Sequence, residues 1–343
     1  MIPFKILVVG GCGYIGTHMV KALLEAGHHP IILDNLSTGH RELLPGGTFI
    51  EGDIADRPLL DSIFSTHTID AVMHFAAYIE VGESVQNPLK YYRNNFIATA
   101  NLIEAMLAHK VLRFIFSSSA AVYGEPQYMP IDEKHPCAPS SPYGESKLFV
   151  EKLLESCRNA HDLQYVSLRY FDAAGADPSG SIGECHIPES HLIPLVLDAA
   201  SGKRPDIKIF GSDYPTPDGT CIRDYIHVND LVQAHLLALN KMLKEKHSAI
   251  YNVGNSRGYT VKEVIKTVKK ITDANIKVIL SARRPGDAAE LIADSTKIKT
   301  QLTWKPIHES LETMVNTARK WQQRRYLLEA KINKSTKAIE PTT

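Results

Sequence analysis

The most constraining feature of this sequence is a glycine-rich turn that follows its first apolar run. The run Phe4–Val9 is apolar and rich in β-branched residues and predicts a buried strand, and the amphipathic segment Gly16–Ala26 predicts a helix. Gly10, Gly13 and Gly16 lie at the junction of the two. Glycines at such a turn permit a tight bend, close approach of a pyrophosphate and close packing of the helix on the strand. The pattern therefore predicts a dinucleotide-binding β-α-β unit.

An acidic residue follows at the end of the second predicted strand. Asp34 ends the run Pro30–Asp34, 18 residues after Gly16. A carboxylate at this place binds both hydroxyls of an adenosine ribose and repels a 2′-phosphate, so we expect NAD in preference to NADP. Asp53, which follows the predicted strand Thr48–Glu51, could reach the adenine. The alternative for Asp53 is that it caps the next helix.

Strand and helix patterns alternate through the first half of the chain. This alternation predicts parallel β-α-β units and hence an α/β fold with a Rossmann-type doubly wound parallel sheet. The further predicted strands are Ala71–Phe75, Leu112–Ser117, Gln164–Tyr170 and Tyr251–Val253. The further predicted helices are Pro58–Ser65, Pro88–His109, Pro142–Cys157, Leu192–Ser201, Val261–Ile271 and Ile307–Arg319.

The composition changes after Tyr170, where Gly, Pro, Ser and Asp become frequent. We therefore expect two interleaved domains. Residues 1–174, with a returning segment at about 225–250, would form the NAD-binding domain. Residues 175–224 and 251–325 would form a smaller C-terminal α/β domain for the substrate, and residues 326–343 a flexible tail.

Charge, hydropathy and cysteine content limit the classes of partner. Lys+Arg and Asp+Glu both number 38, which argues against binding nucleic acid through bulk positive charge. No apolar run is long enough to predict a membrane-spanning helix. Five cysteines, an odd number without a Cys-x-x-Cys pair, favour reduced thiols and a cytoplasmic protein. Cys185, His186 and His191 lack the paired spacing of a zinc site, so no metal is expected.

Tyr143 is the one tyrosine followed four residues later by a lysine, Lys147. The dipeptide Ser141-Pro142 predicts the N-cap and first residue of a helix, which places Tyr143 and Lys147 on one face, one turn apart. To act as a base near pH 7, a phenol must lower its pKa by about three units. A lysine ammonium together with the positive nicotinamide of NAD+ could supply that shift.

Three consecutive serines follow another predicted strand. Ser117, Ser118 and Ser119 lie where Leu112–Ser117 ends, at the carboxyl edge of the sheet, where doubly wound folds bind ligands. We predict that Ser119 hydrogen-bonds the substrate oxygen that loses its proton. The alternative is a polar strand end without a catalytic role.

Taken together, these motifs resemble the extended short-chain dehydrogenase/reductase superfamily and, within it, the UDP-galactose (UDP-glucose) 4-epimerases. The resemblance covers about Ile6 to Trp304. It rests on Gly-Gly-Cys-Gly-Tyr-Ile-Gly (10–16), Asp-Asn-Leu-Ser (34–37), His-Phe-Ala-Ala (74–77), Val-Gly-Glu-Ser-Val-Gln-Asn-Pro-Leu-Lys-Tyr-Tyr (81–92), Phe-Ser-Ser-Ser-Ala-Ala-Val-Tyr-Gly (116–124), Pro-Tyr-Gly-Glu-Ser-Lys (142–147), Arg-Tyr-Phe (169–171), Asp-Tyr-Pro-Thr-Pro-Asp-Gly-Thr (213–220), Arg-Asp-Tyr-Ile-His-Val (223–228) and Arg-Arg-Pro-Gly-Asp (283–287).

The resemblance implies epimerisation at C4 of a UDP-sugar with a tightly bound NAD that is not consumed. Tyr143 would take the proton of the 4-hydroxyl, Ser119 would bind the 4-oxygen, and Lys147 would lower the pKa of Tyr143 and hold the nicotinamide ribose. The NAD-binding residues that it implies are Gly10, Gly13, Tyr14, Ile15, Gly16, Asp34, Asn35, Leu36, Ser37, Thr38, Gly39, Asp53, Ile54, Phe75, Ala76, Ala77, Asn94, Ser117, Tyr143, Lys147, Tyr170 and Phe171.

The resemblance also implies a UDP-sugar site and a homodimer formed through the helices Pro88–His109 and Pro142–Cys157. Arg223 and Arg284 would bind the diphosphate, because a guanidinium matches phosphate oxygens; the alternative for each is a surface ion pair. The implied substrate residues are Ser119, Tyr143, Asp172, His191, Leu192, Phe210, Arg223, Tyr225, Arg284, Asp287 and Leu291, with Phe210 and Tyr225 near the uridine and Asp287 near its ribose.

Four positions depart from the family pattern. Ile79 replaces a lysine that helps to hold the cofactor. Asp172 and His191 replace asparagines near the nucleotide sugar, and a carboxylate cannot donate a hydrogen bond to it. Leu291 occupies the position where, in the family, a bulky tyrosine excludes N-acetyl groups and a small residue admits them. Leucine is intermediate in size, so the sequence predicts neither exclusion nor acceptance of 2-acetamido sugars.

Other reactions remain open to different degrees. A 4,6-dehydratase needs an Asp–Glu pair directly after the strand-end serine, where this chain has Ala120 and Ala121. A 4-epimerase of UDP-N-acetylhexosamines, uronic acids or pentoses would use the same machinery. A non-catalytic NAD-binding protein would usually lack the tyrosine or the lysine, and this chain has both.

Overall fold

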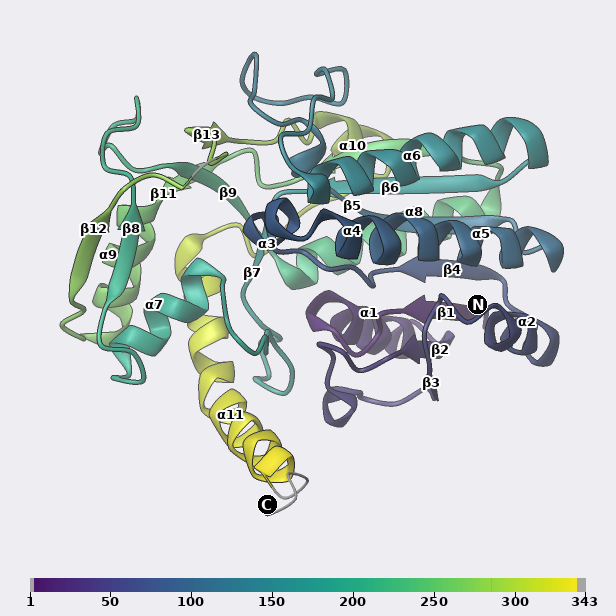
Figure 1. Ribbon diagram of the computed structural model, residues 1–343, viewed down its shortest axis with the longest axis horizontal. Helices are drawn as coiled ribbons and strands as arrows, with labels where there is room; N and C mark the ends of the chain where they lie inside the picture. Colours follow the sequence, from purple (N-terminus) through teal and green to yellow (C-terminus); the bar gives the residue numbers. More distant parts are fainter. Residues whose placement is uncertain (1–2, 285, 338–343) are drawn as a thin grey trace.

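The computed structural model describes residues 3–284 and 286–337, and its larger lobe is built on seven parallel strands (Figure 1). In chain order these are β1 (Lys5–Val9), β2 (His29–Asp34), β3 (Thr48–Glu51), β4 (Ala71–His74), β5 (Arg113–Ser119), β6 (Gln164–Tyr170) and β10 (Ala249–Val253). Their order across the sheet is β10-β6-β5-β4-β1-β2-β3, and each neighbouring pair is parallel. The predicted Rossmann-type doubly wound sheet is therefore confirmed.

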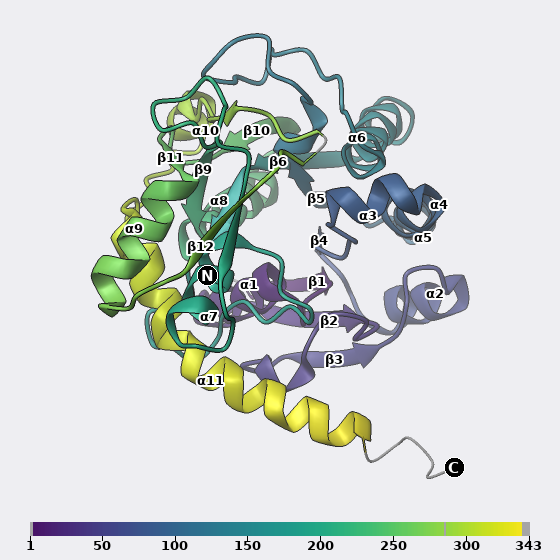
Figure 2. The same cartoon turned by 60° about the vertical axis from the view of Figure 1, so that its left-hand side comes forward.

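Helices cover both faces of this sheet (Figure 2). One face carries α1 (Tyr14–Glu25) and α8 (Val228–Lys244), and the other carries α2 (Arg57–Thr66), α5 (Ala98–Ala108) and α6 (Pro142–His161). Successive strand residues point to opposite faces: Ile6 packs with the first pair of helices, whereas Leu7 packs with the other three. Burial on both faces explains why these strands are apolar throughout.

Short helical segments connect the strands at the carboxyl edge of the sheet. The predicted helix Pro88–His109 is present, but a π-helical stretch, η2 (Tyr92–Ile97), interrupts it. The remaining segments are η1 (Arg41–Leu43), α3 (Val81–Gln86), α4 (Pro88–Tyr91) and η3 (Ala120–Val122).

The smaller lobe has two sheets of its own. Its strands are β7 (Asp172–Ala174), β8 (Ile207–Phe210), β9 (Ile222–His227), β11 (Gly258–Thr260), β12 (Val278–Ser281) and β13 (Glu290–Leu291). Strand β9 pairs with β7, β11 and β13, and β8 pairs with β12. The helices of this half are α7 (Leu192–Ala200), α9 (Val261–Thr272) and α11 (Leu311–Lys337), whereas α10 (Thr296–Gln301) packs on β10 of the main sheet. No helix within the described ranges has a segment both long and apolar enough to span a membrane.

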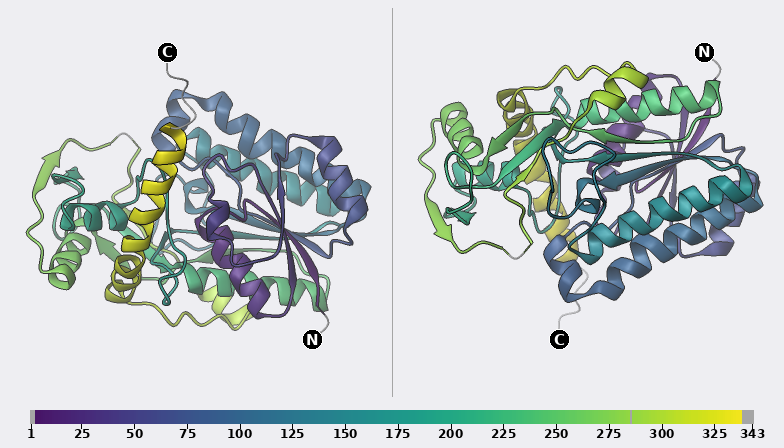
Figure 3. Two further views of the ribbon diagram at one scale, coloured as in Figure 1. Left: turned by 90° about the horizontal axis from the view of Figure 1, so that it is seen from below. Right: turned by 90° about the horizontal axis from the view of Figure 1, so that it is seen from above.

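The C-terminal helix differs from the prediction. The sequence predicts a helix that ends near Arg319 and a flexible tail from residue 326, but α11 continues to Lys337. It lies between the two lobes (Figure 3), and the hydroxyl of Tyr326 donates to Asp198 of α7 at 2.8 Å. Because Asp198 is 128 positions away, the polar composition of this segment gave no sign of that contact. Residues 338–343 of the predicted tail lie outside the described residues.

Four buried histidines make the fold sensitive to acid. Burial lowers the pKa of His18 and His235 to about 4, and that of His74 and His227 to about 3. In the unfolded chain a histidine has a pKa of about 6.5. As the pH falls below that value, the unfolded chain takes up protons that the folded chain does not, so the free energy of unfolding decreases.

We therefore expect the free energy of unfolding to fall between pH 6.5 and pH 4.5, by up to about 1.4 kcal/mol per pH unit for each buried histidine. His235→Phe should reduce this slope, because a phenylalanine cannot take up a proton. Urea unfolding followed by circular dichroism at several pH values measures the effect, with the exposed His161→Phe as control. An identical slope in both variants would contradict the prediction.

Candidate active site

The glycine-rich turn joins the end of β1 to the start of α1. Gly10 has a φ of +78°, and a Cβ on it would lie 2.5 Å from the backbone nitrogen of Ala76. A Cβ on Gly16 would lie 2.1 Å from the carbonyl oxygen of Gly10, because α1 begins close against the turn. A Cβ on Gly13, the N-cap of α1, would meet no described atom of the protein closer than 3.5 Å. The turn is therefore closed by the protein's own packing at two glycines and open at the third, which suits a phosphate at the N-terminus of α1.

Asp34 directs its carboxylate back toward this turn. Its Oδ2 accepts a hydrogen bond from the amide of Cys12, and its Oδ1 accepts one from the amide of Leu36, both at 2.9 Å. Burial raises the pKa of Asp34, although these two amide donors favour the ionised form. Gly39 adjoins the carboxylate, since a Cβ on it would lie 3.1 Å from Oδ1. The loop at residues 34–39, which also holds Ser37 and Thr38, thus lies beside the glycine turn.

Asp53 is brought to the same end of the sheet. Asn35 donates from Nδ2 to Asp53 Oδ2 at 2.7 Å. The alternative that Asp53 caps the next helix is wrong, because Asp56 is the N-cap of α2 and accepts from the amide of Leu59. A surface cavity of about 520 Å³ opens beside Asp53. Its lining residues are Asp53, Ala55, Tyr78, Asn87, Leu89, Lys90, Arg93, Asn94 and Ala98, so it contains two of the predicted cofactor residues.

Tyr143 and Lys147 lie one turn apart at the start of α6. The predicted helix start is confirmed: the hydroxyl of Ser141 accepts from the amide of Gly144 at 3.3 Å, and Pro142 is the first helical residue. Lys147 is buried, and its Nζ donates to the carbonyl of Ser117 at 2.8 Å. Burial lowers the pKa of Lys147 to about 7. The ammonium is therefore tied to the end of β5, 5.9 Å from the centre of the Tyr143 ring.

Residues of both lobes lie around the side chain of Tyr143. Burial raises the pKa of Tyr143, and the carboxylates of Asp172 and Glu80 raise it further. A hydrogen bond from Ser119 lowers the pKa and brings the predicted serine and tyrosine together. Lys147 donates to the strand and not to the phenol, so its lowering of the pKa of Tyr143 stays a prediction.

A buried network that sequence reasoning missed supports this edge. Glu151, one turn after Lys147 on α6, accepts from Ser118 Oγ at 2.6 Å and forms a buried ion pair with Arg169 of β6 at 2.5 Å. Arg169 also donates to the hydroxyl of Tyr123 at 2.9 Å. The available signal was a glutamate four positions after the lysine on a predicted helix, a spacing that places the two on one face.

The other predicted cofactor residues follow the carboxyl edge of the sheet. Phe75, Ala76 and Ala77 come directly after β4, and the hydroxyls of Ser117 and Tyr170 hydrogen-bond each other. The predicted set also includes Ile15 on α1, Ile54 after β3 and Phe171 after β6. The carbonyl oxygen of Ile54 accepts a hydrogen bond from Asn101. Tyr14 turns toward the smaller lobe, where its hydroxyl donates to the carbonyl of Gly175 at 2.7 Å.

Arg223 and Arg284, the two arginines predicted to bind the diphosphate, both contact the carboxylate of Asp287. Arg223 Nη2 lies 3.8 Å from Asp287 Oδ1, and Arg284 donates from Nε to Asp287 Oδ2 at 2.8 Å. The guanidinium of Arg284 lies 4.9 Å from the ring centre of Phe210. Arg223 is largely buried, whereas Arg284 is exposed, and the binding of a diphosphate by either arginine stays a prediction. Tyr225 follows on the same strand as Arg223.

Three of the four departing positions belong to the smaller lobe or to the loop before α7, whereas Ile79 is exposed after β4. Asp172 begins β7 opposite Tyr225, and the guanidinium of Arg223 partly offsets the rise in pKa that burial causes. Leu291 pairs in register with Arg223 and belongs to the apolar cluster that contains Phe171. His191 precedes Leu192 at the start of α7, but its Nδ1 faces two carboxylates of its own loop.

A doubly wound parallel sheet with a glycine turn that is open at Gly13, a carboxylate beside that turn and a tyrosine–lysine helix at its carboxyl edge defines a Rossmann-type dinucleotide-binding protein. Within that class, the model of the NAD dependent epimerase/dehydratase family matches residues 6–254. The chain belongs to this family.

Its relatives are similar over almost their whole length. A UDP-glucose 4-epimerase of Halalkalibacterium halodurans is 54% identical, with 93% of this chain and 95% of that protein aligned. The crystal structure of UDP-glucose 4-epimerase from Brucella ovis in complex with NAD has a TM-score of 0.90 at 42% identity, covering 93% of this chain and 98% of that one. The UDP-Glc/GlcNAc 4-epimerase of Campylobacter jejuni has a TM-score of 0.82 at 43% identity, covering 94% and 99%.

The glycine turn generates a testable contrast. Gly16→Ala should lower the free energy of unfolding by about 1–3 kcal/mol and weaken NAD binding, because its methyl group would collide with the Gly10 carbonyl. Gly13→Ala should leave the stability of the NAD-free protein within about 0.5 kcal/mol of the parent, since no close contact is created. NAD binding should still fall, because the methyl group enters the open side of the turn.

Urea unfolding without NAD, and calorimetric titration with NAD, measure the two effects separately. Equal loss of stability in both variants would show that the turn is packed differently.

Proposed function

We propose that this protein catalyses the reversible interconversion of UDP-galactose and UDP-glucose at C4, with a tightly bound NAD that is not consumed. The observation that carries the proposal is the position of Tyr143. It is a partly buried phenol that shares a hydrogen bond with Ser119 of the NAD-binding edge and lies near the carboxylate of Asp172 of the smaller lobe. The names of the aligned relatives, all 4-epimerases, support the same reaction.

The residues at the carboxyl edge of the sheet suit NAD. The open side of the turn at Gly13 would take the pyrophosphate, Asp34 the adenosine ribose, and Asp53 with Asn94 the adenine end. Each oxygen of Asp34 uses one lone pair on a backbone amide and keeps another for a ribose hydroxyl. Bound NAD supplies the chemistry of accepting a hydride from C4 and returning it to the same carbon.

The protein's own residues would handle the proton and the orientation of the sugar. Tyr143 removes the proton of the 4-hydroxyl and later returns it, while Ser119 hydrogen-bonds the 4-oxygen. Lys147, held on the carbonyl of Ser117, keeps a positive charge near the phenol when it is protonated. Arg223 and Arg284 hold the diphosphate while the 4-keto sugar turns over, and Asp172 accepts a hydrogen bond from a sugar hydroxyl.

A second candidate is a 4-epimerase that also accepts other UDP-sugars, among them N-acetylhexosamines, uronic acids and pentoses. The observation in its favour is Leu291, which packs against the apolar cluster that contains Phe171 and is smaller than a tyrosine. The Campylobacter jejuni relative is named for both UDP-Glc and GlcNAc. Dehydration is disfavoured, because Ala120 and Ala121 carry no acid or base. A non-catalytic NAD-binding role is disfavoured by the presence of Tyr143 and Lys147, both of which are hydrogen-bonded at this edge.

The proposal extends to a homodimer in the cytoplasm. Large apolar side chains are exposed together on the helical layer from α3 to α6, namely Val81, Val85, Leu89, Ile97 and Phe149. A second copy that covers this layer would bury them in a contact between helix pairs. The cytoplasmic location is favoured by the odd number of cysteines, which lack a Cys-x-x-Cys pair.

Proton NMR of the purified protein with UDP-galactose, without added nicotinamide, tests the reaction and the retained cofactor together. We expect the anomeric signal of UDP-glucose to appear. Tyr143→Phe should slow turnover by at least about 100-fold, because the proton acceptor is lost while the NAD site is left intact. Fluorescence titration with NAD is the control for an intact site.

Retained turnover in Tyr143→Phe would contradict the assignment of the base. Failure of the parent protein on UDP-galactose after NAD is supplied, with turnover of UDP-N-acetylglucosamine or a UDP-pentose, would favour the second candidate. Failure on every UDP-sugar with NAD still bound would favour the non-catalytic alternative.

The homodimer is tested by sedimentation equilibrium. Ile97→Glu should shift the mass toward the monomer, because it places a charge within the apolar contact. Ile307→Glu is the matched control, since Ile307 is an exposed isoleucine outside this layer. A parent protein that sediments as a monomer, or an equal shift in both variants, would overturn the dimer.

A further inference from the structure

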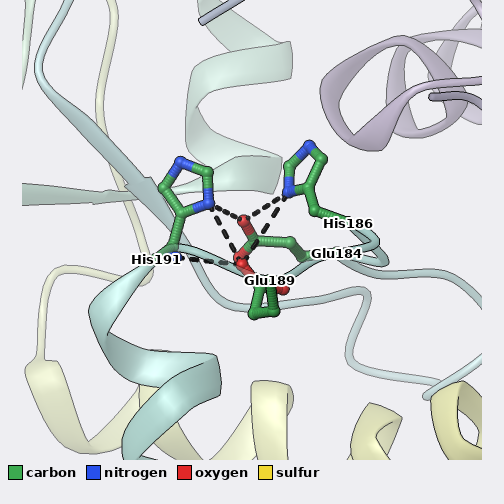
Figure 4. A group of neighbouring side chains, drawn as sticks. All are labelled: Glu184, His186, Glu189 and His191. Carbon is green, nitrogen blue, oxygen red and sulfur yellow. Dashed lines mark hydrogen bonds and ion pairs between the residues drawn. The ribbon is translucent and has the colours of Figure 1, made fainter. Parts of the chain in front are cut away.

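Four side chains converge in the loop that connects β7 to α7 (Figure 4). They are Glu184, His186, Glu189 and His191. One nitrogen from each histidine and one oxygen from each glutamate lie within 4.8 Å of one another. The alternation of acids and histidines at intervals of two and three residues, Glu-x-His-x-x-Glu-x-His, folds all four onto one point. The spacing of Cys185, His186 and His191 alone predicted no metal in this loop.

The distances between these atoms suit a tetrahedral metal site. His191 Nδ1 lies 2.7 Å from Glu184 Oε1 and 3.2 Å from Glu189 Oε1. His186 Nδ1 lies 3.0 Å from Glu184 Oε1 and 4.0 Å from Glu189 Oε1. Ligand bonds of about 2.0–2.1 Å in a tetrahedron place neighbouring ligand atoms roughly 3.3 Å apart. The observed distances lie on both sides of that value, so small side-chain movements would complete the geometry.

Burial distinguishes this group from a surface ion-pair cluster. The side chains of Glu184 and Glu189 are both only 6% exposed. Two adjacent carboxylates removed from water are costly unless a cation compensates them. The histidines close the other side and stay partly exposed, at 22% for His186 and 38% for His191, which leaves a path for an ion to enter.

Surrounding groups hold the carboxylates in place. Glu189 Oε1 accepts from the amides of Ser190 at 2.8 Å and His191 at 3.0 Å, and its Oε2 lies 3.5 Å from Arg325 of α11. The indole of Trp321 donates to the carbonyl of Glu184 at 2.7 Å. Such outer contacts orient metal ligands and restrict their movement.

We propose that Glu184, His186, Glu189 and His191 bind one divalent transition-metal ion, and that this ion is Zn²⁺. Imidazole nitrogens disfavour Mg²⁺ and Ca²⁺, which prefer all-oxygen sites, and two histidines with two carboxylates match zinc. Four protein ligands leave no open position, so the site is structural. The ion would cross-link residues 184–191 of this loop, beside α7 and α11. This cross-link would hold His191 near Asp172 of the candidate active site.

The test uses the full-length protein with its NAD, prepared without a polyhistidine tag. Zinc per chain is measured by mass spectrometry after gel filtration, and chelator-treated protein is titrated with Zn²⁺ and with Co²⁺. We expect one ion per chain, a visible absorption band typical of four-coordinate Co²⁺, and a lower thermal midpoint after metal removal.

His186→Gln and Glu184→Gln should each weaken Zn²⁺ binding by more than roughly tenfold and abolish the Co²⁺ band. Asp61 and His109 form a histidine–carboxylate pair of similar length, 3.0 Å, on which no third ligand of the described residues converges. His109→Gln is therefore the matched control and should leave both readouts unchanged.

Several outcomes would overturn the proposal. One is a parent protein that neither retains Zn²⁺ nor takes up Zn²⁺ or Co²⁺, which would leave hydrogen-bonded ion pairs as the whole role of the group. Another is metal binding that persists in His186→Gln, which would place the ion elsewhere. If Glu184→Gln does not fold, the more exposed His186→Gln decides the question.

Discussion

The carboxyl edge of the main sheet depends on a lysine that is buried inside the protein. The ammonium of Lys147 is compensated by the carbonyl of Ser117 at 2.8 Å and by the nearby carboxylate of Glu151, which raises the pKa of Lys147 against the effect of burial. Glu151 is in turn fixed by Arg169 and Ser118. A buried charge is tolerated only when such partners are fully satisfied, so α6, β5 and β6 are held in one relative position. That arrangement fixes the positions of Tyr143 on α6 and Ser119 on β5 relative to each other.

The buried carboxyl group of Asp224 holds segments of the smaller lobe together beside this edge. Asp224 of β9 accepts from the amides of Asn255, Ser256 and Ala293, and burial raises its pKa to about 7. These bonds join β9, the segment after β10 and the segment after β13. Leu291, which pairs in register with Arg223, packs against the apolar cluster that contains Phe171, the residue directly after β6. The proposed substrate site is thus assembled from chain segments that are distant in sequence.

Local patterns predicted the parts of the site that local geometry controls. The glycine turn, the acid after β2 and the helix start at Ser141 are set by backbone conformation and by contacts a few residues apart, which leave a signature in the sequence. The network around Glu151 and the continuation of α11 past Arg319 were missed, because their partners lie far along the chain. The two arginines were predicted to bind the diphosphate, which stays a prediction, and only the coordinates show that both contact Asp287 and that Arg223 is largely buried whereas Arg284 is exposed.

By itself, the sequence determined the α/β class, the parallel sheet, the dinucleotide turn and the tyrosine–lysine pair, since periodicity, turn chemistry and helix spacing are properties of short segments. The tertiary structure alone decided which charges are buried, which segments of the smaller lobe face Tyr143, and that two glutamates and two histidines of one loop meet at a point. Burial depends on what packs from elsewhere in the chain, and the pKa of a group and its fitness as a ligand follow from burial.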